Sequence, residues 1–212
     1  MHIPEGFIAP STYIPLALID GALLWYSARH LRTLLTPQRI PMIALMSAAI
    51  FVLSSIMIPL PFGTSAHLVG IGLLVALFGW RMSLLIYTMV LLMQFFLLGQ
   101  GGLSTFFVTL FSIGVVGGGS AKALLRLTHH HRWGYFGAGS VAVLVAALTS
   151  ALLLGAQSYY AVDEQGAPLF FPFGWEIVVP TMLGAHLIVA LIEGIITRYS
   201  APYWHKRVED EV

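Results

Sequence analysis

Long apolar runs, interrupted by proline, glycine and charged residues, dominate this chain and predict a bundle of membrane-spanning helices. A helix needs about 20 apolar residues to cross the hydrocarbon core of a bilayer, so runs of this length indicate spans. We expect seven helices, at residues 12–34, 40–59, 67–79, 82–99, 103–127, 134–161 and 173–199. The third is short for a full span and would be tilted or sheltered by its neighbours. The predicted fold is therefore an all-α membrane protein with one domain over residues 1–212.

The composition supports this fold class and excludes several functions. Hydrophobic residues make up 58% of the chain and charged residues only 9%, whereas soluble domains carry about 25% charged residues. There is no cysteine, so disulfides and thiolate metal sites are excluded. A net charge of +1 gives no reason to expect a nucleic-acid partner. No G-x-x-x-x-G-K-[ST] loop occurs, so the chain has no such site for ATP hydrolysis.

The basic residues predict an orientation in the membrane. With seven helices, all 10 lysines and arginines fall on one side, in the first, third and fifth connections and around the end of the last helix. An even number of helices would destroy this separation. Because cytoplasmic loops carry an excess of Lys and Arg, we expect a multi-pass cell-membrane protein with its N-terminus outside. Residues 200–212 would then form a cytoplasmic tail.

The chain begins Met1-His2-Ile3-Pro4-Glu5-Gly6, a sequence that can chelate a metal ion. The α-amine of Met1 and the amide nitrogen of His2 can close a five-membered ring on the metal. That amide nitrogen and Nδ1 of His2 can close a six-membered ring. Three nitrogens then lie in one plane, which suits Ni(II) or Cu(II). The alternative is an ordinary chain start with histidine at its second position.

The chelate requires that Met1 is the mature N-terminus. No basic region precedes the first apolar run, and three prolines interrupt that segment, so we expect no cleavable signal peptide. Residues 1–11 are accordingly predicted to form a metal-chelating segment that folds back into the bundle from outside.

His67 is the candidate for the fourth ligand. It follows an outer connection rich in proline and glycine, Pro59–Ala66, and would stand at the outer end of the third helix. The predicted orientation in the membrane uses only Lys and Arg. It places His67 on the same side of the membrane as Met1 and His2. The alternative is a histidine at a helix end that is satisfied by backbone or water.

Polar residues inside predicted spans are further candidates, because buried ionisable groups in a membrane are costly and commonly functional. Asp20, His186 and Glu193 belong to this group. A supporting or pathway role around the metal is predicted for Glu5, Ser65, Gln94 and His186. Structural alternatives remain for each, such as a hydrogen bond between helices for Gln94 or an exposed loop carboxylate for Glu5. The run from His129 to His131 is interpreted as a solvated basic loop.

These residues together resemble the CbiM/NikM family, the substrate-binding components of energy-coupling-factor transporters for cobalt and nickel. The resemblance starts at Met1-His2-Ile3-Pro4-Glu5-Gly6-Phe7 and continues at Gly63-Thr64-Ser65-Ala66-His67. It includes Leu91-Leu92-Met93-Gln94, Gly101-Gly102-Leu103, Phe111 to Val116, and His186 to Ile196. It therefore covers nearly the whole chain.

The resemblance implies a seven-helix fold whose extracellular N-terminus is inserted into the bundle. It also implies four nitrogen ligands, which map onto the amine of Met1, the amide and imidazole of His2, and His67. The implied partners are a transmembrane coupling subunit, cytoplasmic ATPase subunits and a small accessory membrane subunit. The last is expected as a separate chain, because no long C-terminal extension is present. This chain departs from the family at Gln100, often histidine, and at Thr109, often asparagine.

The sequence therefore predicts a transporter subunit that captures Co²⁺ or Ni²⁺ as transported ligand, with no resident cofactor and no catalytic residues. One alternative is a substrate-binding component for an organic micronutrient. Another is an intramembrane metal-dependent enzyme that uses Asp20, His186 or Glu193, although no spacing such as H-E-x-x-H supports it. A third is an assembly subunit without a ligand.

Overall fold

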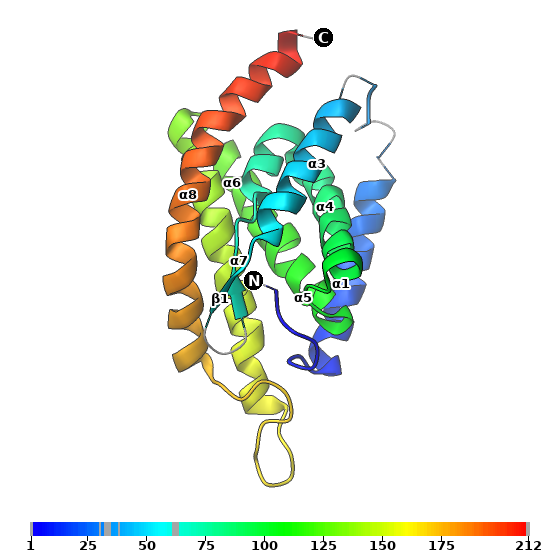
Figure 1. Ribbon diagram of the computed structural model, residues 1–212, viewed down its shortest axis with the longest axis vertical. Coiled ribbons are helices and arrows are strands. Elements are labelled where there is room, and N and C mark those ends of the chain that lie inside the picture. Colours follow the sequence, from blue (N-terminus) through cyan, green and yellow to red (C-terminus); the bar gives the residue numbers. More distant parts are fainter. Residues whose placement is uncertain (1, 30, 32–34, 38, 61–63, 211–212) are drawn as a thin grey trace.

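The computed structural model describes the chain except residues 1, 30, 32–34, 38, 61–63 and 211–212. Figure 1 shows an elongated bundle whose helices run roughly along its long axis. The described helices are α1 (Pro10–Ala28), α3 (Ile40–Ser55), α4 (Ile71–Leu98), α5 (Leu103–Leu110), the π-helix η2 (Phe111–Gly117), α6 (Gly118–Leu127), α7 (Arg132–Tyr160) and α8 (Trp175–Asp210). Because α5, η2 and α6 follow one another without a break, the described residues form six helical segments.

The seven separate helices expected from the sequence are not confirmed, because the third and fourth belong to one element, α4. Gly79 interrupts it with a non-helical backbone (φ 76°, ψ 161°), a conformation that glycine adopts readily because it lacks a Cβ. The break lies between the expected helices 67–79 and 82–99. Two helical arms joined at Gly79 therefore replace two helices joined by a loop.

The expected start of the third helix at residue 67 is wrong. The chain there forms a short antiparallel hairpin of β1 (Ile58–Leu60) and β2 (Thr64–Ala66), with Pro59 opposite Ser65. Pro59 lacks a backbone N–H and cannot continue α3, whereas pairing two strands satisfies backbone groups away from water. Helix α4 begins only after Gly70, whose φ is 71°. His67 therefore lies in the connection between β2 and α4 rather than on a helix.

Four helical stretches are long and apolar enough to cross a membrane: Ile71–Leu98, Leu103–Leu127, Arg132–Tyr160 and Trp175–Trp204. Helix α3 is apolar but shorter. The stretch Leu103–Leu127 matches its predicted bounds, whereas α8 continues to Asp210, beyond the predicted end at 199. The described part of the predicted tail is thus helical.

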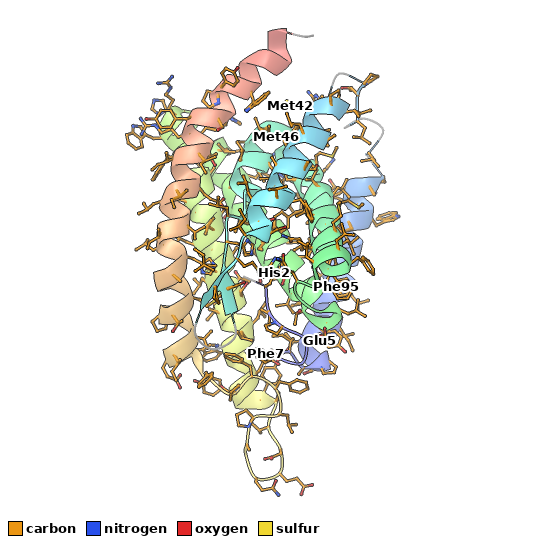
Figure 2. All side chains as sticks on the ribbon, in the orientation of Figure 1. His2, Glu5, Phe7, Met42, Met46 and Phe95 are labelled. Carbon is orange, nitrogen blue, oxygen red and sulfur yellow. The ribbon has the colours of Figure 1, made fainter. Side chains whose placement is uncertain are left out.

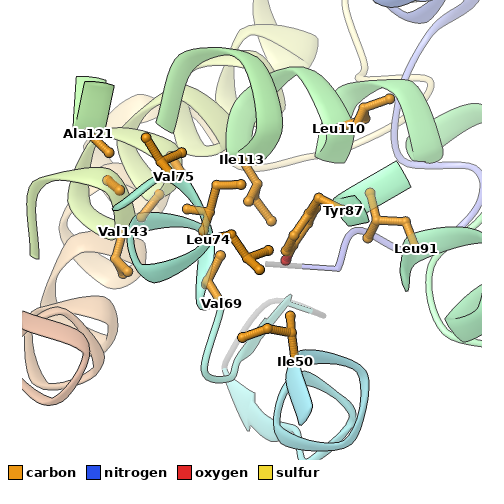
Figure 3. Close-up of a cluster of buried hydrophobic side chains, with 14 of the residues drawn as sticks. Ile50, Val69, Leu74, Val75, Tyr87, Leu91, Leu110, Ile113, Ala121 and Val143 are labelled. Atoms are coloured by element: carbon orange, nitrogen blue, oxygen red, sulfur yellow. The ribbon is translucent and has the colours of Figure 1, made fainter. Parts of the chain in front are cut away.

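The apolar core lies where the α4 arms meet α7 and the α5–α6 stretch. Figure 3 shows Leu74 of the first α4 arm, Val69 of the preceding connection and Ile50 of α3 near Tyr87 of the second α4 arm. All four are at most 5% exposed. This core carries the connection after β2 and so positions the neighbouring His67.

The described lysines and arginines lie at one end of the bundle, uppermost in Figure 1. There Arg81, just past the α4 break, donates a hydrogen bond to Tyr26 near the end of α1. Arg198 of α8 lies over the ring of Trp133 at the start of α7, 3.8 Å from its centroid. The charge separation predicted from the sequence therefore has a counterpart in the fold.

Candidate metal site

The segment before α1 folds into the bundle instead of leaving it. Ile3 is 0% and Ile8 1% exposed, and in Figure 1 the dark blue segment rises between the helices. Thr105 Oγ1 donates a hydrogen bond of 2.7 Å to the carbonyl oxygen of Ile3. Ala9 N–H donates one of 2.9 Å to Oε1 of Gln157 in α7. These contacts fix both ends of the segment against different helices.

Glu5 and Gly102 form the tightest contact of this segment. Oε2 of Glu5 accepts a hydrogen bond of 3.1 Å from the backbone N–H of Ser104. A Cβ added to Gly102 would lie 2.8 Å from Cβ and 2.9 Å from Cα of Glu5. Gly102 has an extended backbone (φ −150°), so the position needs glycine for space and not for conformation. Glu5 is exposed, and its hydrogen bond to Ser104 holds the segment against the start of α5.

The structure brings His2 and His67 together. Their rings are stacked, with centroids 4.8 Å apart and planes at 21°, and only 6% of His2 and 2% of His67 is exposed. Figure 2 shows His2 deep in the bundle, with Glu5 and Phe7 nearer its lower end. Burial lowers the pKa of His2 to about 3 and that of His67 well below its usual value. Both rings are therefore neutral near pH 7, the state in which imidazole binds metals.

The orientation of His67 leaves one ring nitrogen for a ligand. Nδ1 lies 2.9 Å from the carbonyl oxygen of Leu68. A carbonyl can only accept, so Nδ1 carries the proton and Nε2 has the lone pair. Nε2 is buried without a hydrogen-bond partner among the described residues. Metal-binding histidines commonly have this arrangement, with one nitrogen on a backbone carbonyl and the other on the metal.

Glu193 of α8 holds the connection that carries His67. Its Oε1 accepts hydrogen bonds from the backbone N–H groups of Val69 and Gly70, the latter at 2.9 Å. Glu193 is 3% exposed. The sequence named this residue as a buried ionisable candidate, and the geometry gives it a positioning contact.

A cleft of about 590 Å³ opens beside His2. It is lined by His2, Pro4, Glu5, Met57, Pro59, Ser65, Leu98, Gly99, Gln100 and Gly101. A much narrower space of about 10 Å³ lies behind it, and both Gln100 and Thr109 line that space together with His2. The two positions where this chain departs from the family pattern are thus both neighbours of His2.

The other predicted residues have different surroundings. Ser65 lines the cleft and donates a hydrogen bond to the sulfur of Met57. Gln94 instead donates to Ser54 Oγ of α3 at 2.9 Å, as a bridge between helices. Asp20 is 0% exposed in α1 and does not line the cleft. His186 is 0% exposed in α8, and its charge influences the pKa of His67.

Sequence reasoning missed three residues that hold the site, Thr105, Gln157 and Phe171. Phe171 is 1% exposed and packs against Phe7, with ring centroids 5.3 Å apart. Their partners lie far away in the sequence, so no local spacing indicates them. A polar Gln157 inside an apolar span was the one available signal.

His2 and His67 cannot form a complete metal site by themselves. Within the described part of the chain, no three His, Cys, Asp or Glu side chains are close enough to hold one ion. Further ligands would have to come from the backbone or from the terminal amine. The predicted ligand Met1 lies outside the described residues.

Comparison with known proteins gives the family. Residues 2–210 match the model of the CbiM family, described as the cobalt uptake substrate-specific transmembrane region. The chain is 32% identical over 221 residues to the fused nickel transport protein NikMN of Rhodobacter capsulatus, which covers 100% of this chain and 63% of that protein. It is 31% identical over 195 residues to LarMN of Lactiplantibacillus plantarum, covering 90% of this chain and 60% of LarMN. The chain thus spans less than two thirds of the length of these relatives.

Two solved structures share the fold. A truncated transition metal transporter has a TM-score of 0.92 and 28% identity, covering 98% of this chain and 99% of that one. A transition metal transporter has a TM-score of 0.91 and 28% identity, covering 99% and 94%. With apolar helices long enough to span a membrane, this fold and a family match over nearly its whole length, the chain is a multi-pass membrane protein that belongs to the CbiM family.

Proposed function

We propose that this chain captures Ni²⁺ or Co²⁺ outside the cell as the substrate-binding subunit of an energy-coupling-factor importer. The observation that carries the proposal is the buried, stacked pair of His2 and His67, which is held against an N-terminal segment folded into the bundle. The family match and the nickel transport described for NikMN support a transition metal as the substrate.

The donor set would be completed by the α-amine of Met1 and the amide nitrogen of His2. The amine, the amide and the Nδ1 atom of His2 form two fused chelate rings, and Nε2 of His67 is the fourth nitrogen. Planar four-nitrogen geometry would favour Ni²⁺ over Co²⁺, whereas Cu²⁺ accepts the same geometry and would bind more tightly than either. The amide has to lose its proton on binding, and so does the amine wherever it is protonated.

The remaining parts of the importer would be separate proteins. The chain has no phosphate-binding loop of the G-x-x-x-x-G-K-[ST] type, so cytoplasmic ATPase subunits would supply the energy through a transmembrane coupling subunit. A small accessory membrane subunit would complete the assembly. The gathering of lysines and arginines at one end of the bundle supports a cytoplasmic location for that end, and the cleft beside His2 would then open outside.

Metal titration of the purified chain tests the proposal. The intact chain should bind one Ni²⁺ or Co²⁺, and one glycine added before Met1 should weaken binding by more than about 100-fold. Changes outside a metal's direct ligands already cost 10–100-fold, and the extension removes a ligand. His67→Asn should weaken binding similarly, whereas His129→Asn at an exposed loop should not. Undiminished affinity after the extension would refute the proposal.

A further inference from the structure

His186 is a buried imidazole that the proposed four-nitrogen site does not use. It lies within α8, 0% exposed. Its Nδ1 is 2.7 Å from the carbonyl oxygen of Met182, one turn earlier. Because this carbonyl can only accept, Nδ1 carries the proton and Nε2 has the lone pair. Nε2 has no hydrogen-bond partner among the described residues. His186 therefore has the same arrangement as His67, with a backbone carbonyl on one nitrogen and a bare second nitrogen.

The fold places His186 at the level of His67. Oε1 of Glu193 accepts a hydrogen bond of 2.9 Å from Gly70 N–H, which fixes one point of contact between α8 and the connection after β2. From Glu193 back to His186 the helix descends about 10 Å, at 1.5 Å per residue. From Gly70 back to His67 the chain can descend by a similar distance, at no more than about 3.5 Å per residue.

Both segments run in the same direction, toward the upper end in Figure 1. Similar steps from one contact therefore place His67 and His186 at about the same level along the bundle. The charges of His2 and His186 both act to lower the pKa of His67, so both rings lie within electrostatic range of it.

The three imidazoles do not surround one point. Within the described ranges, no three such side chains approach closely enough to bind a single ion. An ion held by His67 and His186 would therefore not be held by His2 at the same time. A costly buried polar nitrogen without a partner, next to a metal ligand, indicates a second position for the ion.

We propose that Nε2 of His186 is a second, inner metal ligand, which takes the ion together with His67 after capture at the N-terminal chelate. The proposal rests on the proposed function and adds a residue that the chelate does not contain. The ion would move from a position between His2 and His67 to one between His67 and His186, on the α8 side of the connection. His67 would remain bound throughout, so the ion would never lose all its protein ligands.

The test uses the full chain with one glycine before Met1, which disables the outer chelate and leaves the inner pair intact. Ni²⁺ titration of this extended chain should detect one residual site. In the same background, His186→Asn should weaken that site at least tenfold, and so should His67→Asn. Asparagine can still donate to the Met182 carbonyl from the Nδ1 position but lacks the Nε2 atom. His129→Asn is the matched control and should leave the residual affinity within twofold.

Pulsed electron paramagnetic resonance with Cu²⁺ gives a second measurement. The extended chain that also carries His2→Asn should still show two imidazoles on the copper, those of His67 and His186. One imidazole, or residual affinity unaffected by His186→Asn, would overturn the proposal. An intact chain that binds no Ni²⁺ or Co²⁺, or is indifferent to the extension, would instead refute the proposed function itself.

Discussion

Replacing Gly102 with alanine should displace the N-terminal segment without touching either histidine. The added Cβ would lie 2.8 Å from Cβ and 2.9 Å from Cα of Glu5, where carbon atoms prefer about 3.5–4.0 Å. The positions of Cα and Cβ are both fixed by the backbone, so rotation of the Glu5 side chain relieves neither contact. The segment must therefore move by roughly 1 Å. Gly102 itself has an extended backbone that alanine adopts freely, so the whole effect is steric.

Overpacking of this kind typically costs about 1–3 kcal/mol. His2 is only three residues from Glu5, and Ile3 between them is held by the 2.7 Å hydrogen bond from Thr105. A displacement at Glu5 would therefore be transmitted to the chelate. If the strain is expressed mainly in binding, 1.4 kcal/mol per factor of ten converts it to a loss of about 5- to 150-fold in Ni²⁺ affinity.

The assay is Ni²⁺ titration together with thermal unfolding of the purified protein. Gly119→Ala in α6 is the control, because a Cβ there has no atom within 4 Å, and alanine favours a helix by up to about 1 kcal/mol. The control should bind Ni²⁺ normally and unfold at the same or a slightly higher temperature. If Gly102→Ala binds within twofold of the parent and unfolds at the same temperature, the segment is not the part that positions the site.

Four further predictions concern Glu193, Phe171 and the two buried histidines. Glu193→Ala should lower the free energy of unfolding by about 2–6 kcal/mol, because two buried N–H groups lose their acceptor at about 1–3 kcal/mol each; Glu193→Gln keeps an oxygen there and should cost clearly less in the same denaturation assay. Phe171→Ala should cost about 3–5 kcal/mol, whereas Leu169→Ala, 61% exposed, should stay within about 0.5 kcal/mol; equal losses would contradict the packing of Phe171 on Phe7. Between pH 7 and 5.5 the Ni²⁺ dissociation constant should rise about 100-fold per pH unit, from protons on the amide and the amine. The imidazoles add nothing there because burial lowers the pKa of His2 to about 3 and that of His67 well below 6.5, so a four-proton slope in pH-dependent titrations would contradict their burial. The unfolded chain binds protons at these two rings below about pH 6.5, whereas the folded chain does not. The free energy of unfolding of the metal-free protein should therefore fall as the pH drops below that value.

The long spans could be predicted from the sequence because apolarity alone determines them. The stretch Leu103–Leu127 has its predicted bounds, and α7 differs from its prediction by two residues at the start and one at the end. The prediction was wrong at the end of α8 and at the connection before α4, where apolarity does not determine the structure. Helix α8 passes the end of its apolar run, because polar residues can continue a helix once it is formed. The hairpin of β1 and β2 was missed because its strands are only three residues each, too short for a pattern.

The candidate site was predictable to the extent that its chemistry is local. The donors of His2 follow from its position in the sequence, and His67 followed from the side of the membrane to which the basic residues assign it. The contacts that hold these residues are not local. Thr105 reaches Ile3 across 102 residues, and Gln157 reaches Ala9 across 148. Such pairs arise from the packing of helices in three dimensions, and no spacing along the chain encodes them.

The spaces around His67 bear on how an ion could move inward. The cleft beside His2, at about 590 Å³, can hold an ion with its water shell. On the α8 side of the connection, the cavity lined by Val69, Gly70 and Glu193 is only about 30 Å³, enough for one or two waters. A hydrated ion therefore cannot cross at this level. Inward movement requires either protein ligands that replace the water, as His67 and His186 would, or a movement of the connection that Glu193 holds in place.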